Sequence, residues 1–240
     1  MGRRASGRRR SLAAALFTAG FVTQGCGASP PTTPPPVTAK PPKKDYGSAA
    51  KGGEGGEVHS AAMQQLLETP YELRNDKTKT IGVLLPDSDH WTRVRFWGVK
   101  SVVGFRYGRE HHAIAGAFTV EVPKDAPTGA CSKAFEAWAD PWVRAFEVEM
   151  EHEPPQAVVW RGDVAEIDSL VARTATLAAR DEYAAAYGSY PAWPGTCLIV
   201  GVAVPARGDL YRAKAVRDRF VKDVLPKVEI LSKEPPKELY

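Results

Sequence analysis

Residues 197–206 read CLIVGVAVPA, and nearly every side chain in this run is apolar. A short apolar run of this kind is typical of a strand whose two faces are both covered by other parts of the protein. We therefore expect residues 197–206 to form a central strand of a sheet. Residues 182–190 are expected to form another strand, and residues 191–195 (PAWPG) supply the turn between the two.

Downstream of this run lies the clearest helix signal in the chain. Asp209 stands in the position of an N-cap, and an apolar stripe at helical spacing follows it. The stripe consists of Leu210, Ala213, Val216, Phe220, Val224 and Leu225. Pro226 is expected to stop or kink the helix because proline lacks the backbone N–H that a helix interior needs. The sequence thus predicts an amphipathic helix near the C-terminus.

Upstream, several runs alternate in the manner of strands. Residues 91–97, 101–107 and 112–122 are predicted strands, and the turn at 108–110 joins the last two into an antiparallel hairpin. Gly116 interrupts the third run and predicts a bulge. Residues 146–151, with one acidic face, and the apolar residues 157–161 predict two more strands.

Two further helices are expected between these strands. Residues 132–142 favour a short helix that Asp140-Pro141 ends. Asp163 and Glu166 have the spacing of a capping box, which predicts a helix over residues 163–174. The alternative is a strand, because the threonine and valine residues of this segment also suit one. The sum is an α+β fold, with a mainly antiparallel sheet of about six to eight strands and two or three packing helices.

Besides Cys26, the chain contains two cysteines, Cys131 and Cys197. In an oxidising compartment two thiols can persist as a disulfide, and with two cysteines only one intramolecular pairing exists. The alternative is two separately buried thiols, because a free cysteine packs as a small hydrophobic residue. Both interpretations remain open from the sequence.

An aromatic and basic cluster forms a candidate ligand face. Its members are Trp91, Arg93, Arg95, Trp97, Arg106 and Tyr107. Guanidinium groups stack on aromatic rings, so such a surface can bind a glycan or an anionic polymer. The alternative is a half-buried sheet face that a helix covers.

The sequence lacks the common catalytic and metal-binding signatures. The sequence contains no nucleophile elbow, no zinc-protease motif and no Gly-rich phosphate loop. His111 and His112 point to opposite faces of a strand and cannot easily bind one ion together, whereas Glu151 and Glu153 share a face. We expect no catalytic residue, metal site or cofactor. The alternative is an envelope hydrolase or metal-dependent enzyme that uses Glu151, Glu153 and a histidine brought close by folding.

Residues 1–25 have the pattern of a signal peptide. Five arginines precede residues 12–22 (LAAALFTAGFV), an apolar run too short to span a bilayer. The Gly25-Cys26 pair that follows resembles the lipobox of bacterial lipoproteins, although Thr23 stands where leucine is usual. The resemblance implies cleavage before Cys26 and attachment of acyl chains such as palmitate to this residue. The alternatives are a plain secretory signal and an uncleaved N-terminal anchor.

Composition divides the rest of the chain into a tether and one globular domain. Residues 26–58 contain the lipidated cysteine and a Pro-rich and Gly-rich tether that we expect to be disordered. Residues 59–232 form the predicted domain, and residues 233–240 a frayed tail. Without residues 1–25 the chain has 27 basic and 28 acidic residues, a net charge of −1. The charge therefore predicts no nucleic-acid partner.

The order of strands and helices also resembles, at the level of topology, the PsbP-type α/β/α sandwich. This resemblance implies a non-enzymatic domain of a lumen or periplasm. The predicted function is that of a membrane-anchored envelope lipoprotein, a non-catalytic binding or accessory domain whose partner is an envelope protein or polymer. By the lipoprotein resemblance, Gly27 in place of an aspartate favours the outer over the inner membrane.

Overall fold

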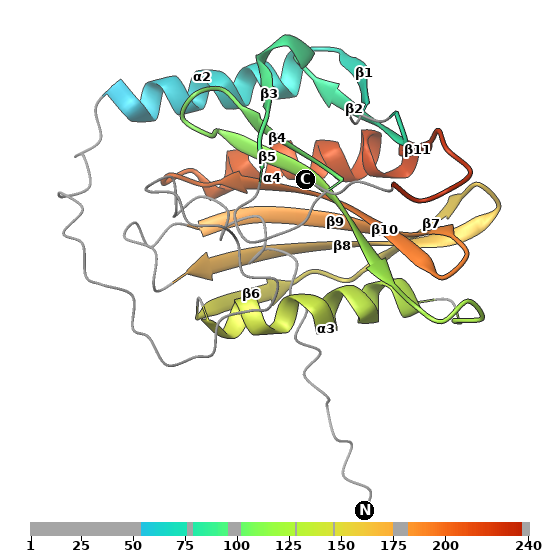
Figure 1. Cartoon of the computed structure of the whole chain (residues 1–240). Coiled ribbons are helices and arrows are strands. Elements are labelled where there is room, and N and C mark those ends of the chain that lie inside the picture. Colours follow the sequence, from blue (N-terminus) through green and yellow to red (C-terminus); the bar gives the residue numbers. More distant parts are fainter. Residues whose placement is uncertain are drawn as a thin grey trace, which may run out of the picture.

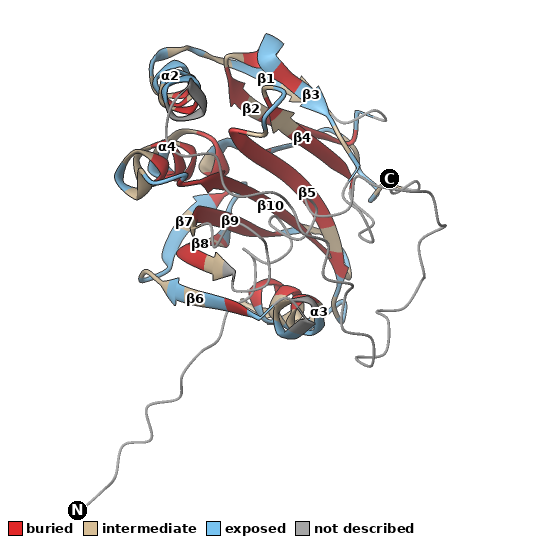
Figure 2. Cartoon of the chain, turned by 90° about the vertical axis from the view of Figure 1, so that its left-hand side faces the viewer, coloured by how far each residue is buried: buried red, intermediate tan, exposed pale blue. Residues whose placement is uncertain are grey.

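A computed structural model describes residues 54–75, 79–95, 102–127, 129–145, 147–174 and 182–236. Figure 1 shows an antiparallel sheet and the three α-helices of these residues, α2 (Glu54–Glu68), α3 (Ala130–Ala145) and α4 (Leu210–Asp223). Helices α2 and α4 lie on one face of the sheet and α3 lies on the other (Figure 2). The expected α+β class, with a helix near the C-terminus, is confirmed. The predicted signal peptide and Cys26 lie outside the described residues.

The main sheet has eight strands and every pairing in it is antiparallel. Seven follow the order β3-β4-β5-β10-β9-β8-β6, and β7 also pairs with β8. Their bounds are β3 Trp91–Arg93, β4 Val103–Tyr107, β5 Ala113–Glu121, β6 Val148–His152, β7 Gln156–Trp160, β8 Asp163–Thr174, β9 Glu182–Trp193 and β10 Thr196–Pro205. Strand β10 lies between β5 and β9, so the central position expected for the 197–206 run is confirmed.

Strand β10 divides the core of the domain into two halves. Leu198, Val200 and Val202 point to the side of α2 and α4 and join the larger hydrophobic cluster. Cys197, Ile199 and Ala203 point to α3 and join the smaller one. Successive side chains of a strand point to opposite faces. Strand β10 is apolar along its length because both faces of the sheet are covered there. Figure 2 shows the buried residues of β10 in red.

A second, smaller sheet was not expected from the sequence. It contains β1 (Tyr71–Asn75), β2 (Ile81–Pro86) and β11 (Glu229–Ile230), in the order β1-β2-β11. The buried side chains of β2, Ile81, Val83 and Leu85, extend the core on the side of α2 and α4. Helix α2 begins at Glu54, inside the range assigned to the tether, and its buried Met63 and Leu66 join the same cluster.

The C-terminal helix follows its sequence signals closely. The Asp209 side chain accepts a hydrogen bond from the Arg212 backbone N–H at 2.9 Å, as expected of an N-cap. Ala213, Val216 and Phe220 are buried. Pro226 lies in the short 3-10 turn η2 (Leu225–Lys227) that follows the helix. Local capping and periodicity therefore suffice to explain α4.

The sequence-based expectation of a helix at 163–174 is wrong, because these residues form β8. Arg161 and Gly162 have positive φ angles of 53° and 88° and turn the chain from β7 into β8. Strand β8 then pairs with β7 and β6 along one edge and with β9 along the other. Pairing on both edges outweighs a local capping motif in a segment rich in β-branched residues.

Two smaller expectations are also corrected. Helix α3 continues through Pro141 to Ala145, and an ion pair between Asp140 and Arg144 spans the proline. Gly116 is not a bulge, because it stays in register with Gly104 on β4 and Gly201 on β10. Three glycines thus lie side by side across the sheet.

A buried arginine joins α4 to the sheet. The Arg217 side chain is 2% exposed, and its Nη1 and Nη2 atoms each lie 2.9 Å from an oxygen of the Glu153 carboxylate. Lys214 and Asp218 extend this network. A buried guanidinium without such partners would strongly destabilise the fold. The network therefore fixes the position of α4 against the segment between β6 and β7, where Glu153 lies.

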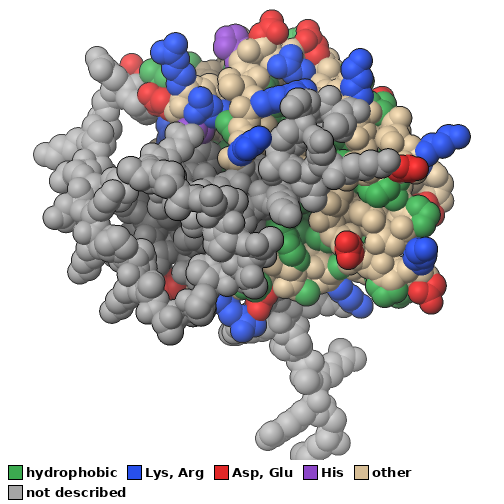
Figure 3. Space-filling view, viewed as in Figure 1, with side chains coloured by type: hydrophobic (Ala, Val, Ile, Leu, Met, Phe, Trp, Pro, Cys, Tyr) green, Lys and Arg blue, Asp and Glu red, His purple; other side chains and the backbone are tan. Residues whose placement is uncertain are grey.

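Charged side chains of both signs are interspersed over the described part of the face in Figure 3. Large exposed apolar side chains include Tyr211 on α4 and the cross-strand neighbours Val159 and Val164. Among the helices that the structure describes, none combines the length and apolar character needed to cross a membrane.

The packing of Tyr190 requires a glycine at position 188. The buried Tyr190 ring covers Gly188, and its hydroxyl donates a hydrogen bond to the Leu225 carbonyl. A Cβ at position 188 would lie 2.1 Å from the Tyr190 Oη. We expect Gly188→Ala to lower the free energy of unfolding by about 1–3 kcal/mol through overpacking, as measured by chemical denaturation.

Gly82→Ala is the matched control for this substitution. Its Cβ would meet the exposed Leu73 side chain at 3.0 Å, which can move away. An equal loss of stability in both variants would contradict the proposed role of Tyr190.

Candidate functional site

A cavity of about 380 Å³ lies where the first turn of α3 meets the sheet. Its walls include Cys131 and Ser132 of α3, Glu166 of β8, Ser189 of β9 and Cys197 of β10. Residues that are far apart in the sequence therefore converge on one concave site. Pockets of this size with a few converging polar groups are the usual form of small-molecule sites.

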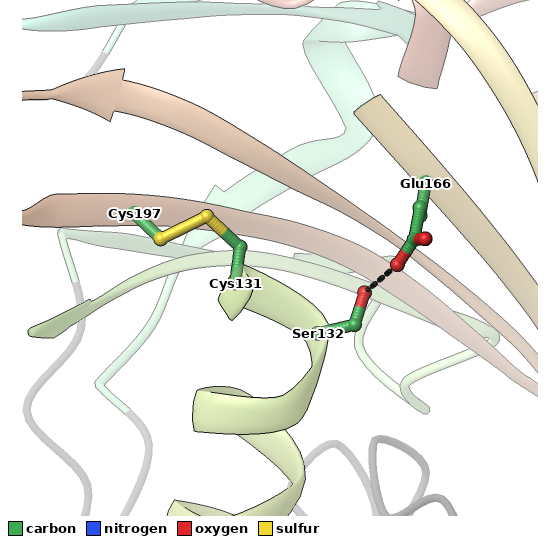
Figure 4. The surroundings of a disulfide bond; sticks show 4 residues. All are labelled: Cys131, Ser132, Glu166 and Cys197. Atoms are coloured by element: carbon green, nitrogen blue, oxygen red, sulfur yellow. Dashed lines mark hydrogen bonds between the residues drawn. A yellow bond between two sulfur atoms is a disulfide. The ribbon is translucent and has the colours of Figure 1, made fainter. Parts of the chain in front are cut away.

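A disulfide bond forms part of the cavity wall. The Cys131 and Cys197 sulfurs are 2.03 Å apart and join the first turn of α3 to the start of β10 (Figure 4). Both residues are buried. Of the two interpretations that the sequence left open, the structure contains the bridge. The bond holds the N-terminus of α3 against the sheet.

Glu166 lies at the N-terminus of α3, although it belongs to β8. Its Oε2 accepts a hydrogen bond from the Ser132 hydroxyl at 2.8 Å (Figure 4). Helix α3 has no acidic residue of its own in its first turn, so the β8 carboxylate supplies a negative charge at its positive dipole end. Gly129 lies beside this carboxylate, where an added Cβ would be 3.4 Å from Oε1.

Ser189 is a buried polar residue of this site that lacks a described partner. It pairs directly with Glu166 in the β8–β9 register, and its side chain is 3% exposed. Among the described residues its Oγ has no hydrogen-bond partner. A buried hydroxyl without a partner is costly, and native proteins retain few of them.

Further carboxylates lie near Glu166. Burial raises the pKa of Asp168, and the charges of Glu166 and Glu136 raise it further, while a hydrogen bond from Tyr187 acts in the opposite direction. Glu166 and Glu136 therefore both lie within electrostatic range of Asp168.

The described residues of the predicted aromatic and basic face do not form one exposed surface. Trp91 and Tyr107 lie together, with ring centroids 5.3 Å apart, but both are buried in the core. The Trp91 indole N–H donates to the Pro86 carbonyl at 2.7 Å, and the Tyr107 hydroxyl donates to Asp87.

The arginines of that predicted face point elsewhere. Arg93 and Arg95 are exposed, Arg106 donates to the His111 ring at 2.9 Å, and Trp97 lies outside the described residues. The described rings of this cluster, Trp91 and Tyr107, therefore do not present open faces to a ligand.

The carboxylates of the alternative enzyme hypothesis also have other partners. Glu151 pairs with Arg173 and Glu153 pairs with Arg217. His111 contacts Arg106, whereas His112 contacts His59. In the part of the chain that the structure describes, no three His, Cys, Asp or Glu side chains are grouped closely enough to hold a metal ion.

A buried histidine pair links α2 to the sheet. His59 Nε2 lies 3.0 Å from the Pro205 carbonyl oxygen, and His59 Nδ1 lies 2.9 Å from His112 Nδ1. A carbonyl can only accept, so His59 Nε2 carries the hydrogen and its Nδ1 accepts from His112. Each neutral ring therefore has a defined tautomer.

Solved structures with a similar fold include the Ran-binding protein Mog1p of Saccharomyces cerevisiae. That match has a TM-score of 0.50 and 10% sequence identity, and covers 69% of this chain and 97% of Mog1p. The cyanobacterial PsbP of Synechocystis is also similar, with a TM-score of 0.45, 15% identity, and coverage of 68% and 93%. No protein-family model matches the chain, and no curated protein matches it. At these identities the comparison concerns the fold alone.

Sequence reasoning missed the cavity because its polar groups meet only through strand register. The capping-box spacing assigns Glu166 to a helix, whereas the residue lies on β8. Ser189 lies in the predicted strand at 182–190, and no sequence motif pairs it with another polar residue. A correct register for β8 and β9 would have placed the two side chains opposite each other.

Removing the disulfide tests its structural role. The bond closes a loop with a sequence separation of 66 residues. Replacing both Cys131 and Cys197 by alanine should lower the free energy of unfolding by about 4 kcal/mol, because the unfolded chain gains freedom. Cys26→Ala is the control and should leave the denaturation midpoint unchanged. A double variant as stable as the parent would refute this role.

The histidine pair predicts a specific pH dependence. Burial lowers the pKa of His59 to about 4, and the charges of Arg207 and His112 act in the same direction. Below pH 6.5, the unfolded chain takes up a proton that the folded protein does not, so stability is complete above pH 6.5 and declines as the pH falls to about 4. His59 alone should contribute a decline of about 3 kcal/mol.

The measurement is the free energy of unfolding between pH 7 and pH 4 for the parent and for His59→Gln. The variant should lose the part of the slope that His59 contributes, whereas His111 and His112, whose pKa values burial also lowers, still contribute theirs. His90→Gln, at an exposed histidine, should keep it. Identical slopes in the parent and His59→Gln would show that the pair does not titrate as described.

Proposed function

We propose that the protein is an exported, lipid-anchored binding or accessory domain of the cell envelope, with its binding site in the cavity beside α3. The Cys131–Cys197 disulfide is the observation that carries the proposal. Disulfides persist in oxidising compartments such as the periplasm and are rare in the cytosol. The Arg-rich segment and apolar run before Cys26 support export independently.

The sequence between Cys26 and α2 suits a tether. Residues 27–53 are rich in proline and glycine and, fully extended, would span roughly 90 Å. Acyl chains on Cys26 would hold the domain at a bilayer, because more than one chain gives stable anchoring. We propose the outer membrane, since glycine rather than aspartate follows Cys26.

The composition of the cavity favours binding over catalysis. Ser132 is hydrogen-bonded to Glu166, and among the described residues that line the cavity there is no histidine to act as a base. The carboxylates Glu151 and Glu153 are paired with arginines. The partner in this proposal is an envelope component, and the mixed surface charge in Figure 3 gives no support for a nucleic-acid partner.

The anchor is tested by mass spectrometry and cell fractionation in a bacterial host. The mature protein should begin at a diacylated or triacylated Cys26 and sediment with membranes. Cys26→Ser should release the protein into the soluble fraction, because the residue that carries the acyl chains is lost. The variant lacking Cys131 and Cys197 is the matched control and should stay with the membranes. An intact Met1, or a mature chain that begins at an unmodified Ser or Ala, would overturn the anchor.

A further inference from the structure

The cavity beside α3 has the polar groups to hold a particular class of ligand. We propose that it binds a compact primary amine, whose ammonium group lies between the Glu166 carboxylate and the Ser189 hydroxyl. This inference rests on the proposed function in taking the cavity as the binding site, and it adds the chemistry of the ligand.

Glu166 supplies the negative charge. The Ser132 hydroxyl occupies one position on its Oε2, and among the described residues no lysine or arginine pairs with this carboxylate. A carboxylate offers about four acceptor positions, so Glu166 retains capacity for further donors. Gly129 leaves space beside Oε1, because it has no side chain to fill it.

Ser189 supplies the second contact and points independently to a ligand. It lies opposite Glu166 on the neighbouring strand and lines the same cavity. Its side chain is 97% buried, and no described group hydrogen-bonds to its Oγ. A ligand N–H in the cavity, over the face of the sheet where these two side chains lie, would satisfy this hydroxyl and the carboxylate together.

The charge around the cavity favours a cation. Asp163 lies on the rim and Glu166 in the wall, whereas the exposed Lys124 is the basic residue of the lining. A primary ammonium group offers both the positive charge and the N–H donors that Glu166 and Ser189 require. A quaternary ammonium offers the charge but no donor.

The test is a titration of the ¹⁵N-labelled full-length chain with ethanolamine, followed by two-dimensional NMR. The amide resonances of Ser132, Glu166 and Ser189 should shift together with one Kd. Choline, which has no N–H group, should bind about tenfold more weakly or worse. Glu166→Gln should weaken ethanolamine binding by about tenfold or more, because a charge-assisted hydrogen bond is lost.

Ser189→Ala provides a second variant that does not disturb α3. It should weaken ethanolamine binding by about threefold or more, since one hydrogen bond to the ligand disappears. Glu229→Gln, at an exposed carboxylate of the smaller sheet, should bind like the parent. Spectral dispersion verifies that each variant is folded.

Three results would overturn the proposal: no shift at the cavity amides, choline binding as tightly as ethanolamine, or an unchanged Kd in both Glu166→Gln and Ser189→Ala. The titration needs no membrane, so its failure is distinct from failure of the anchor. Conversely, an unprocessed N-terminus would remove the envelope role without changing the Kd for ethanolamine.

Discussion

The covalent bond between Cys131 and Cys197 is the constraint on which the account depends. It joins the first turn of α3 to the start of the central strand, so the helix cannot move away from the sheet without unfolding part of it. That position brings Ser132 to Glu166 and forms one wall of the cavity. The same bond requires an oxidising compartment to persist. Fold, candidate site and proposed location therefore share one physical cause.

Strand β10 extends from this disulfide to the contact with α2. Its start is bonded to α3, and at its end the Pro205 carbonyl accepts a hydrogen bond from His59 of α2. Between these points its side chains fill the cores on both faces of the sheet. Strand β10 therefore connects α2 to the cavity. Helix α2 begins within the range predicted for the tether.

Local sequence patterns predict the elements whose structure depends mainly on nearby residues. The apolar run at 197–206 indicates burial on both faces, and the cap and stripe after Asp209 indicate α4, with no knowledge of the neighbours. Strand β8 could not be predicted this way, since its partners on both edges come from distant segments. The site shows the same limit. Ser189 and Glu166 are unremarkable in the sequence, and only strand register places them opposite each other.

The most direct measurement counts free thiols in protein isolated from cells without reductant. The sample is denatured, treated with an alkylating reagent, and analysed by peptide mass spectrometry. The account predicts that Cys131 and Cys197 are unlabelled and appear as one cross-linked peptide pair, and that both become labelled after reduction. Full labelling of both residues before reduction would contradict it. In that case the cavity would lack its covalent wall, and the argument for export from the disulfide would fail.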